Sequence, residues 1–355
     1  QAVNNTGVLT IIGATCNGGS SSTAAMSNTN VLYVRSLSAS GYARGIDNSG
    51  GNGQSVAALT SAEWSSHDQI SQNTSQPGML KLPINETPEI IWDDPSQWQA
   101  VTNPGVGVDA TAAIQAAIDA GKTTVYFENN GKTYTIKGKI YVRGNVRTLF
   151  GFGVNLDVID DKGETPSAGF VVQDGTAPVV VFEDFQGGYD GWYWVQQQST
   201  RSVAVKNVLN WGVQKSAGSG DLYLEDVCAH PWTWFEFNGG NVWARQFNTE
   251  CRISTKIVST ATNLWILGLK TEWGQSGATI IDTKGGGQTE VCGFLSYDVT
   301  DPGTLPMFIV NESKFSAVGA ENSWGAVYTN IVQETIDGVT KTLQASSLPK
   351  ACGNA

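Results

Sequence analysis

One short pattern reads VAVKNV at residues 203–208, LYLEDV at 222–227, VWARQF at 242–247 and LWILGL at 264–269. It consists of an apolar residue, any residue, an apolar residue, any two residues and a third apolar residue. Further copies, with Thr289 at one apolar position, are VVFEDF at 180–185, TEVCGF at 289–294 and FSAVGA at 315–320. The pattern thus recurs about every 22 residues, and an internal repeat of this length indicates a solenoid.

The repeats have the periodicity of strands. Each alternates for three or four residues and then meets Gly, Asn, Asp or Ser. No repeat holds ten residues of helical periodicity, which argues against helix-pair solenoids and leucine-rich horseshoes. We therefore predict an all-β chain that forms a right-handed parallel β-helix, with coils of about 22 residues that bury their faces against each other.

Composition limits the function. Hydrophobic residues make up 40% of the 355 positions, which excludes a disordered chain, and 41 glycines with only 15% charged residues fit a turn-rich β protein. The net charge of −11 repels phosphate backbones, so we expect no nucleic-acid partner. No apolar run approaches the roughly 18 residues of a membrane span.

The cysteines and the first residue carry further expectations. The five cysteines lack metal-ligand spacing, so we expect buried thiols with at most one disulfide, no metal site and no cofactor. Because the chain starts at Gln1 and shows no signal peptide, we interpret it as a mature or excised product.

Two further copies of the pattern lie near the N-terminus, at Leu9-Ile11-Ala14 and Leu32-Val34-Leu37. We interpret residues 1–46 as terminal coils of a first β-helix. Coil ends expose strand edges that proteins cap, and no cap precedes these two. They are therefore expected to dock on a missing N-terminal β-helix, on a second copy of the protein, or on the second β-helix of the same chain.

The remaining chain divides into three parts. Residues 47–102 hold a Gly-rich breaker and several prolines, which predicts an extended linker on a surface. Residues 103–345 form the main β-helix domain, and 346–355 form a C-terminal tail.

A single short helix is predicted at the start of the main domain. Asp109 or Thr111 is its expected N-cap, and Gly121 ends it. Ile114, Ala117 and Ile118 have the spacing of one buried face. Because strands follow directly, this helix is expected to cap the first coil.

The stretch VDATAAIQAAID at 108–119, with TVYF at 124–127 and YTI at 134–136, resembles the opening of pectate-lyase-like β-helix domains. In these domains a helix caps the first coil, and two domains often stand in tandem, as in fungal and bacterial β-1,3-glucanases. WARQFNTE at 243–250 and LWILGLKTE at 264–272 look like uncharacterised secreted bacterial members. The resemblance covers roughly residues 100–340 and implies a secreted, extracellular or cell-surface protein. The Gly-His-Gly and Arg-x-Lys motifs of polygalacturonases are missing, so the resemblance implies the fold more firmly than the chemistry.

Equal offsets in successive coils stack about 4.8 Å apart, so the repeat predicts columns of side chains. One residue after each start, Tyr223, Trp243 and Trp265 are predicted to point outward as a platform for sugar rings. The alternative is that the 47–102 linker covers them.

A second column lies eight residues after each start and contains Trp211, His230, Glu250, Glu272 and Tyr297. Two carboxylates in adjacent coils are typical of a glycosidase acid/base or acid/nucleophile pair. We therefore predict Glu250, Glu272 and His230 as catalytic residues. Trp211, Tyr297 and Trp232, which lies near His230, are predicted as substrate-binding residues. The alternative is that both glutamates only satisfy backbone N–H groups in turns.

A third column, three residues after each start, alternates in charge through Glu183, Lys206, Glu225 and Arg245. We interpret it as a cross-strand ion-pair ladder without chemistry. Two functions follow from all these features: a secreted protein that binds or cleaves polysaccharide as a glycoside hydrolase, or a subunit of an extracellular filament assembled head to tail through its coils.

Overall fold

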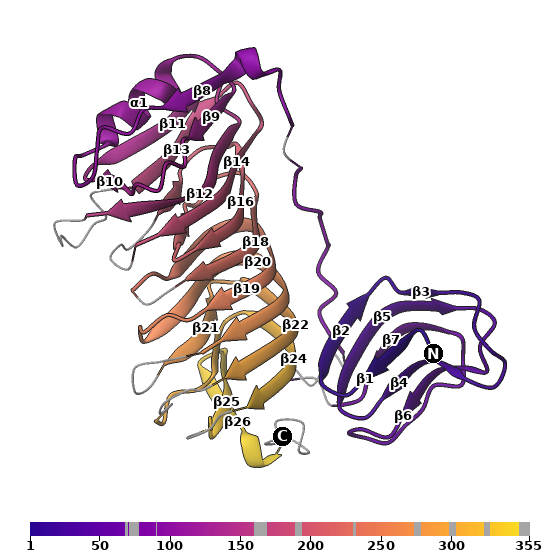
Figure 1. Cartoon of the computed structure of the whole chain (residues 1–355). Coiled ribbons are helices and arrows are strands. Elements are labelled where there is room, and N and C mark those ends of the chain that lie inside the picture. Colours follow the sequence, from indigo (N-terminus) through magenta and orange to yellow (C-terminus); the bar gives the residue numbers. More distant parts are fainter. Residues whose placement is uncertain are drawn as a thin grey trace.

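The computed structural model describes residues 1–67, 70, 78–89, 91–159, 169–188, 194–229, 232–272, 278–297, 303–322 and 327–347. The chain is 58% strand and 5% helix, and it forms a parallel β-solenoid of about 13 turns with coils about 23 residues apart (Figure 1). The predicted all-β parallel solenoid is therefore confirmed.

The repeated pattern aligns in one ladder of parallel strands. Its starts pair directly across neighbouring coils, for example Val203 with Leu222, and Val242 with Leu264. The strands of this ladder are β14 (Val179–Gly187), β16 (Ser202–Leu209), β18 (Leu222–Ala229), β19 (Phe235–Thr249), β20 (Thr255–Thr271), β22 (Gln288–Tyr297) and β24 (Lys314–Asn322).

The two-residue gap in the pattern has a conformational cause. Its fifth residue takes a left-handed backbone conformation in six coils: Asp184, Asn207, Asp226, Gln246, Gly268 and Gly293. In a straight strand the sixth residue would point outward. The left-handed residue bends the strand and returns the sixth residue to the interior, so all three apolar positions of a copy are buried. We call these six residues the bend column.

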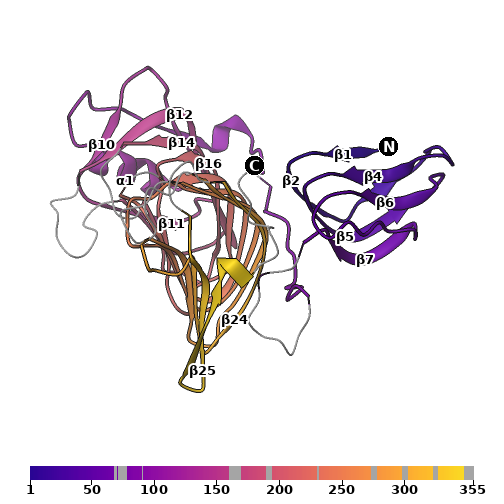
Figure 2. The same cartoon turned by 90° about the horizontal axis from the view of Figure 1, so that it is seen from below.

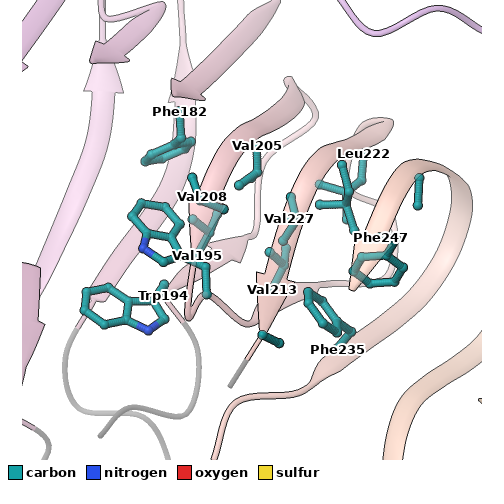
Figure 3. Close-up of a cluster of buried hydrophobic side chains, with 14 of the residues drawn as sticks. Phe182, Trp194, Val195, Val205, Val208, Val213, Leu222, Val227, Phe235 and Phe247 are labelled. Carbon is teal, nitrogen blue, oxygen red and sulfur yellow. The ribbon is translucent and has the colours of Figure 1, made fainter. Parts of the chain in front are cut away.

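The core fills the inside of the coils. Leu222, Leu224 and Ile266 have no exposed surface, and Leu269 is buried as well, as the pattern predicts. Figure 3 shows how Phe182, Val205, Leu222 and Phe247 from successive coils point into the same interior. Stacked side chains of this kind hold each coil to its neighbours.

A second ladder lines the other side of the coils. Its strands are β11 (Lys139–Gly144), β13 (Gly169–Gly175), β15 (Val195–Gln197), β17 (Val213–Lys215), β21 (Thr279–Lys284), β23 (Phe308–Asn311) and β25 (Asn330–Ile336), with segments of β19 and β20 between β17 and β21. Strand β10 (Tyr134–Ile136) pairs with the end of β12 (Thr148–Val158). Strand β26 (Val339–Gln344) pairs antiparallel with β25 at the C-terminal end and is followed by the short 3-10 helix η2 (Ala345–Ser347).

The helix caps the first coils as predicted. Helix α1 (Thr111–Asp119) buries Ile114, Ala117 and Ile118, and Gly121 follows it with a φ of 79°. Asp109 acts one position outside the N-cap Ala110, where its Oδ1 accepts hydrogen bonds from the N–H and hydroxyl of Thr111 at 2.9 and 2.6 Å. The strands at this end are β8 (Trp98–Val101), β9 (Thr124–Phe127) and β12 (Thr148–Val158), and the 3-10 helix η1 (Pro95–Gln97) precedes them.

An N-terminal unit of short coils lies beside the solenoid in both views (Figures 1 and 2). A row of asparagines ties its coils together, because Asn5 donates to Asn28, Asn28 to Asn48, and Asn48 to Asn52 at 2.6–3.1 Å. Its strands are β1 (Val3–Asn5), β2 (Val8–Ile12), β3 (Thr15–Cys16), β4 (Ala24–Asn28), β5 (Val31–Ala39), β6 (Arg44–Asn48) and β7 (Thr60–Ser65).

The predicted boundary between residues 46 and 47 falls inside β6, and β7 pairs antiparallel with β5. The unit therefore reaches into the region expected to be linker. The Asn- and Gly-rich breaker belongs to this unit because Asn48 and Asn52 end its asparagine row. Only residues 78–94, apart from residue 90, form the predicted extended connection among the described residues; we call this segment the strap.

A buried carboxyl in β24 makes stability depend on pH. Glu321 is 3% exposed and accepts a 3.0 Å hydrogen bond from the N–H of Tyr328. Burial raises the pKa of Glu321 to about 7. In the unfolded chain a glutamate carboxyl has a pKa of about 4.3. Between this pH and about 7, Glu321 therefore keeps its proton in the native state but loses it on unfolding. The free energy of unfolding therefore falls as pH rises from about 4.3 to about 7.

We expect Glu321→Gln to remove this fall, which is at most about 4 kcal/mol, in urea unfolding between pH 4.5 and 7.5. The exposed Glu312 gives the matched control Glu312→Gln, which should keep the slope. An identical slope in wild type and Glu321→Gln would refute the role of this carboxyl.

Candidate functional site

The strap runs along the outer face of the solenoid from the C-terminal coils to the helix-capped end (Figure 1). It crosses one coil after another and bonds to most of them. These contacts are Leu80 N–H to Ser316 Oγ (3.0 Å), Leu82 N–H to Glu290 (2.9 Å), Trp243 Nε1 to Pro83 O (2.8 Å), Arg245 to Asn85 O (2.7 Å), Lys206 to Glu89 (3.8 Å) and Arg147 to Asp93.

The strap covers the predicted aromatic platform. Tyr223 and Trp243 stack at 5.0 Å, and Tyr223, Trp243 and Trp265 are only 7%, 5% and 2% exposed. They pack in one cluster with Met79 and Leu82 of the strap. The expectation that they form an open sugar platform is therefore wrong, and the alternative that the linker covers them is confirmed.

A buried ion pair fastens the N-terminal unit to the same solenoid. Arg35 of β5 forms a salt bridge with Glu290, which has no exposed surface. Glu290 also accepts the backbone N–H groups of Lys81 and Leu82 at 2.8 and 2.9 Å. Ile70 adds two backbone hydrogen bonds to Ala317. The N-terminal coils thus dock on their own chain, which removes the observation that motivated the filament interpretation.

A groove of about 850 Å³ lies between β2 and the bend column. Val8 and Thr10 line one side, and the charged column from Glu183 to Arg245 lines the floor. Gly293 allows this approach, since a Cβ there would lie 2.6 Å from Thr10 Oγ1. The charged column, predicted to have no chemistry, therefore faces the groove, and Lys206 reaches Glu183 at 3.8 Å.

The two predicted catalytic glutamates meet at the edge of this groove. Thr249 and Thr271 are paired across adjacent coils, so the residues that follow them, Glu250 and Glu272, project side by side. Lys270, which lines the groove, places its Nζ 2.5 Å from Glu250 Oε1 and 3.0 Å from Glu272 Oε2. Since both distances share the Nζ atom, the two carboxylate oxygens can be no farther apart than the sum of these two distances.

The environment separates the two carboxyls in acidity. Burial opposes ionisation of Glu250, but hydrogen bonds from Lys270 and Asn248, the latter at 2.7 Å, outweigh it and hold its pKa below the usual range. Burial raises the pKa of Glu272, and its hydrogen bond to Glu250 favours the protonated form further. The two carboxyls therefore differ in acidity, with Glu250 the stronger acid and Glu272 the weaker, which is the order that a nucleophile or base and a general acid require.

A buried lysine ties the two coils together behind the pair. Lys256 is 1% exposed, and its Nζ donates to the carbonyl oxygens of Thr249 and Glu272 at 3.0 and 2.6 Å and to Thr271 Oγ1 at 2.8 Å. Burial lowers the pKa of Lys256 to about 8. These bonds fix the backbone from which both glutamates project.

The other predicted site residues lie in different places. Trp211 was predicted to contact substrate, which is wrong because it is fully buried and stacks on Trp194 at 5.5 Å. Tyr297 is half-buried and follows Ser296, the partner of Thr271, so it comes from the coil next to Glu272. Trp232 is 45% exposed. His230 lies outside the described residues.

The described part of the chain also lacks the features required for a metal site, a disulfide and a membrane-spanning helix. No group of three or more His, Cys, Asp or Glu side chains there could hold a metal ion. Cys16, Cys228, Cys251 and Cys292 are free thiols. None of the described helices has the length and apolar character needed to cross a bilayer.

The sequence prediction missed two features. Lys270 is two residues before Glu272 on the same outward side of the strand, and that spacing was the signal for a shared contact. Five aromatic residues from four separate segments also form an open surface near the helix: Trp92, Trp98, Tyr126, Phe150 and Phe152.

Comparison with known proteins gives no further assignment, since neither a protein-family model nor a curated protein matches this chain.

Proposed function

We propose that this chain is a secreted glycoside hydrolase that binds and cleaves an extracellular polysaccharide at the groove beside Glu250 and Glu272. The observation that carries the proposal is the carboxyl pair with opposite pKa shifts at the edge of an open groove. The helix-capped solenoid and the motifs around residues 108–136 support membership of the pectate-lyase-like superfamily.

The roles follow from protonation. Glu272 donates its proton to the glycosidic oxygen as the bond to the anomeric carbon breaks. Glu250, whose lowered pKa favours the carboxylate, attacks that carbon and forms a glycosyl ester, which water then hydrolyses with Glu272 acting as the base. Retaining enzymes place the two carboxyls about 5–5.5 Å apart and inverting enzymes about 6.5–9.5 Å. The two oxygens bound by Lys270 lie no farther apart than the sum of 2.5 and 3.0 Å, which is below the inverting range, so we propose retention.

Lys270 has two effects in this mechanism. Its ammonium group stabilises the ionised form of Glu250, and its contact with both carboxyls holds them at one distance. A sugar entering the site takes the place of one of these contacts. The exposed fraction of the Lys270 side chain, 38%, leaves it room to move aside.

The test is release of reducing ends from polysaccharides by the purified full chain. We expect wild type to release them from at least one neutral glucan, mannan or xylan, and the double variant Glu250→Gln/Glu272→Gln to release none. Anomeric NMR should show that the first product keeps the configuration of the substrate. Equal amounts of reducing ends from wild type and the double variant, or none from either, would reject the proposal.

A further inference from the structure

The helix-capped end of the solenoid carries an open aromatic surface, which we call the aromatic patch. Trp92 stacks on Trp98 at 5.9 Å and meets Phe150 edge-on at 5.6 Å. Tyr126 and Phe152 extend the same surface, with ring distances of 4.3 Å between Phe150 and Phe152 and 6.2 Å between Tyr126 and Phe152. Trp92 is 64% exposed and Phe152 is 42% exposed. Large rings left open to water in one cluster mark a binding surface.

The backbone next to the exposed Trp92 is anchored by Asp93. The Asp93 carboxylate forms an ion pair with Arg147, also accepts a hydrogen bond from Arg147 Nε at 3.0 Å, and accepts bonds from the hydroxyls of Thr123 and Thr124. The Asp93 carbonyl accepts the indole N–H of Trp98 at 3.1 Å. With this backbone anchored and the Trp92 ring packed on Trp98 and Phe150, a ligand that stacks on the ring has less conformational freedom to remove.

Phe152 is exposed by a bulge. Strand β12 pairs with β14 on both sides of it, but residues 151–153 lie opposite the single residue Asp184. Phe152 takes a φ of 53°, a left-handed conformation that is unusual for a bulky side chain. Bulges of this kind re-aim a side chain at a functional surface, and here the ring is aimed outward beside Phe150.

The aromatic patch continues the floor of the groove. Tyr126 pairs with Phe150, Phe150 with Glu183, and Glu183 with Lys206, so one outward column runs from the patch into the groove. A linear ligand lying along the solenoid axis would contact both. Sugar rings present apolar C–H faces that stack on aromatic rings, and the net charge of −11 repels acidic sugars.

We propose that the aromatic patch is a second binding site, for the distal part of a neutral hexose or pentose polysaccharide whose other end occupies the groove. This proposal deepens the proposed function and rests on it for the ligand class. The patch holds the chain by stacking and takes no part in cleavage.

The test is isothermal titration with neutral hexasaccharides: β-1,3-linked and β-1,4-linked glucose, β-1,4-linked mannose and β-1,4-linked xylose. Polygalacturonate is the acidic comparison. The protein is the full chain carrying Glu250→Gln/Glu272→Gln, so that no ligand is cleaved. The variants Trp92→Ala and Phe152→Ala are compared with Val339→Ala, which removes an exposed apolar side chain of β26, outside the patch and the groove.

We expect at least one neutral hexasaccharide to bind, Trp92→Ala and Phe152→Ala each to weaken binding by about tenfold, and Val339→Ala to leave it unchanged. Trp92→Phe should recover part of the affinity because a ring remains. Failure to bind any neutral hexasaccharide, tighter binding of polygalacturonate, or equal losses in Val339→Ala and the patch variants would overturn the proposal. The two proposals fail separately: hydrolysis by wild type with unaffected binding in Trp92→Ala rejects only the patch, and patch-dependent binding without hydrolysis rejects only the enzyme.

Discussion

Glu272→Gln is expected to lower the rate of glycoside hydrolysis by about 10²–10⁴-fold, the usual contribution of a positioned general acid. Glutamine keeps the size of the side chain and can still contact Lys270, but it has no proton to give to the leaving oxygen. Substrates whose leaving group needs no protonation, such as aryl glycosides of acidic phenols, should lose far less rate. The measurement is kcat/KM against the pKa of the leaving phenol.

Glu250→Gln is expected to show the complementary behaviour. Because it removes the nucleophile, good leaving groups should not restore the rate, whereas an added small anion such as azide should restore part of it and give a glycosyl azide. The exposed Glu312, outside the groove, supplies the control Glu312→Gln. Identical leaving-group dependence in the two variants would contradict the separate roles.

The pH profile provides a second readout of the same pair. Activity requires ionised Glu250, whose pKa is lowered, and protonated Glu272, whose pKa is raised. Activity should therefore fall on the acidic side as Glu250 gains a proton and on the alkaline side as Glu272 loses its own. The alkaline limb should disappear in Glu272→Gln when the substrate is an aryl glycoside of an acidic phenol.

Glu290→Gln is expected to destabilise the chain by about 3–5 kcal/mol, because it leaves the Arg35 guanidinium buried without a countercharge. The Arg35 side chain is 10% exposed and the Glu290 side chain is fully buried, so water cannot replace the lost partner. Glutamine can still accept a backbone N–H from the strap, so the loss reports mainly on the charge. Urea unfolding measures the effect, and limited proteolysis shows whether the N-terminal unit separates first.

The exposed pair of Arg44 and Asp47 is the matched control for this experiment. Its side chains are 47% and 54% exposed, and Asp47→Asn should change stability by less than about 1 kcal/mol. The double variant Arg35→Met/Glu290→Gln should recover much of the loss because it removes the unpaired charge. A loss below about 1 kcal/mol in Glu290→Gln would show that the ion pair does not hold the unit in place.

The sequence predicted the solenoid because its coils repeat one local rule. Three apolar positions and one left-handed residue, such as Asn207 or Gly268, recur at nearly constant spacing. The same register placed Glu250 beside Glu272, since their coils pair without a shift between Val242 and Phe247 and on to Thr249.

The prediction from the repeat register was wrong for Trp211, where the chain bends one residue earlier. Trp211 occupies the same offset as Glu250, but Asn210 before it takes a φ of 65° and bends the chain inward. Trp211 is therefore directed to the core. The left-handed conformation of one residue such as Asn210 cannot be predicted from the pattern of apolar residues.

The remaining errors concern contacts between distant segments. The alternation of apolar residues shows that Trp243 points out of its coil. Its exposure to solvent, however, depends on the strap, whose backbone groups bond to the solenoid and hold it over this side chain. Strand β7 and the aromatic patch arise in the same way, from residues far apart in the chain. Trp92 and Phe152 come from separate segments of the sequence, and no periodicity connects them.

The course of the strap has a consequence for how the solenoid opens. In an array whose coils touch only their neighbours, terminal coils fray independently of the middle. Here one segment bonds to Ser316 near one end and to Arg147 near the other. Opening the last coils releases one anchor of a segment that also covers Trp243 in the middle. Amide hydrogen exchange should therefore report one cooperative unit along the whole face, in place of a gradient from the ends.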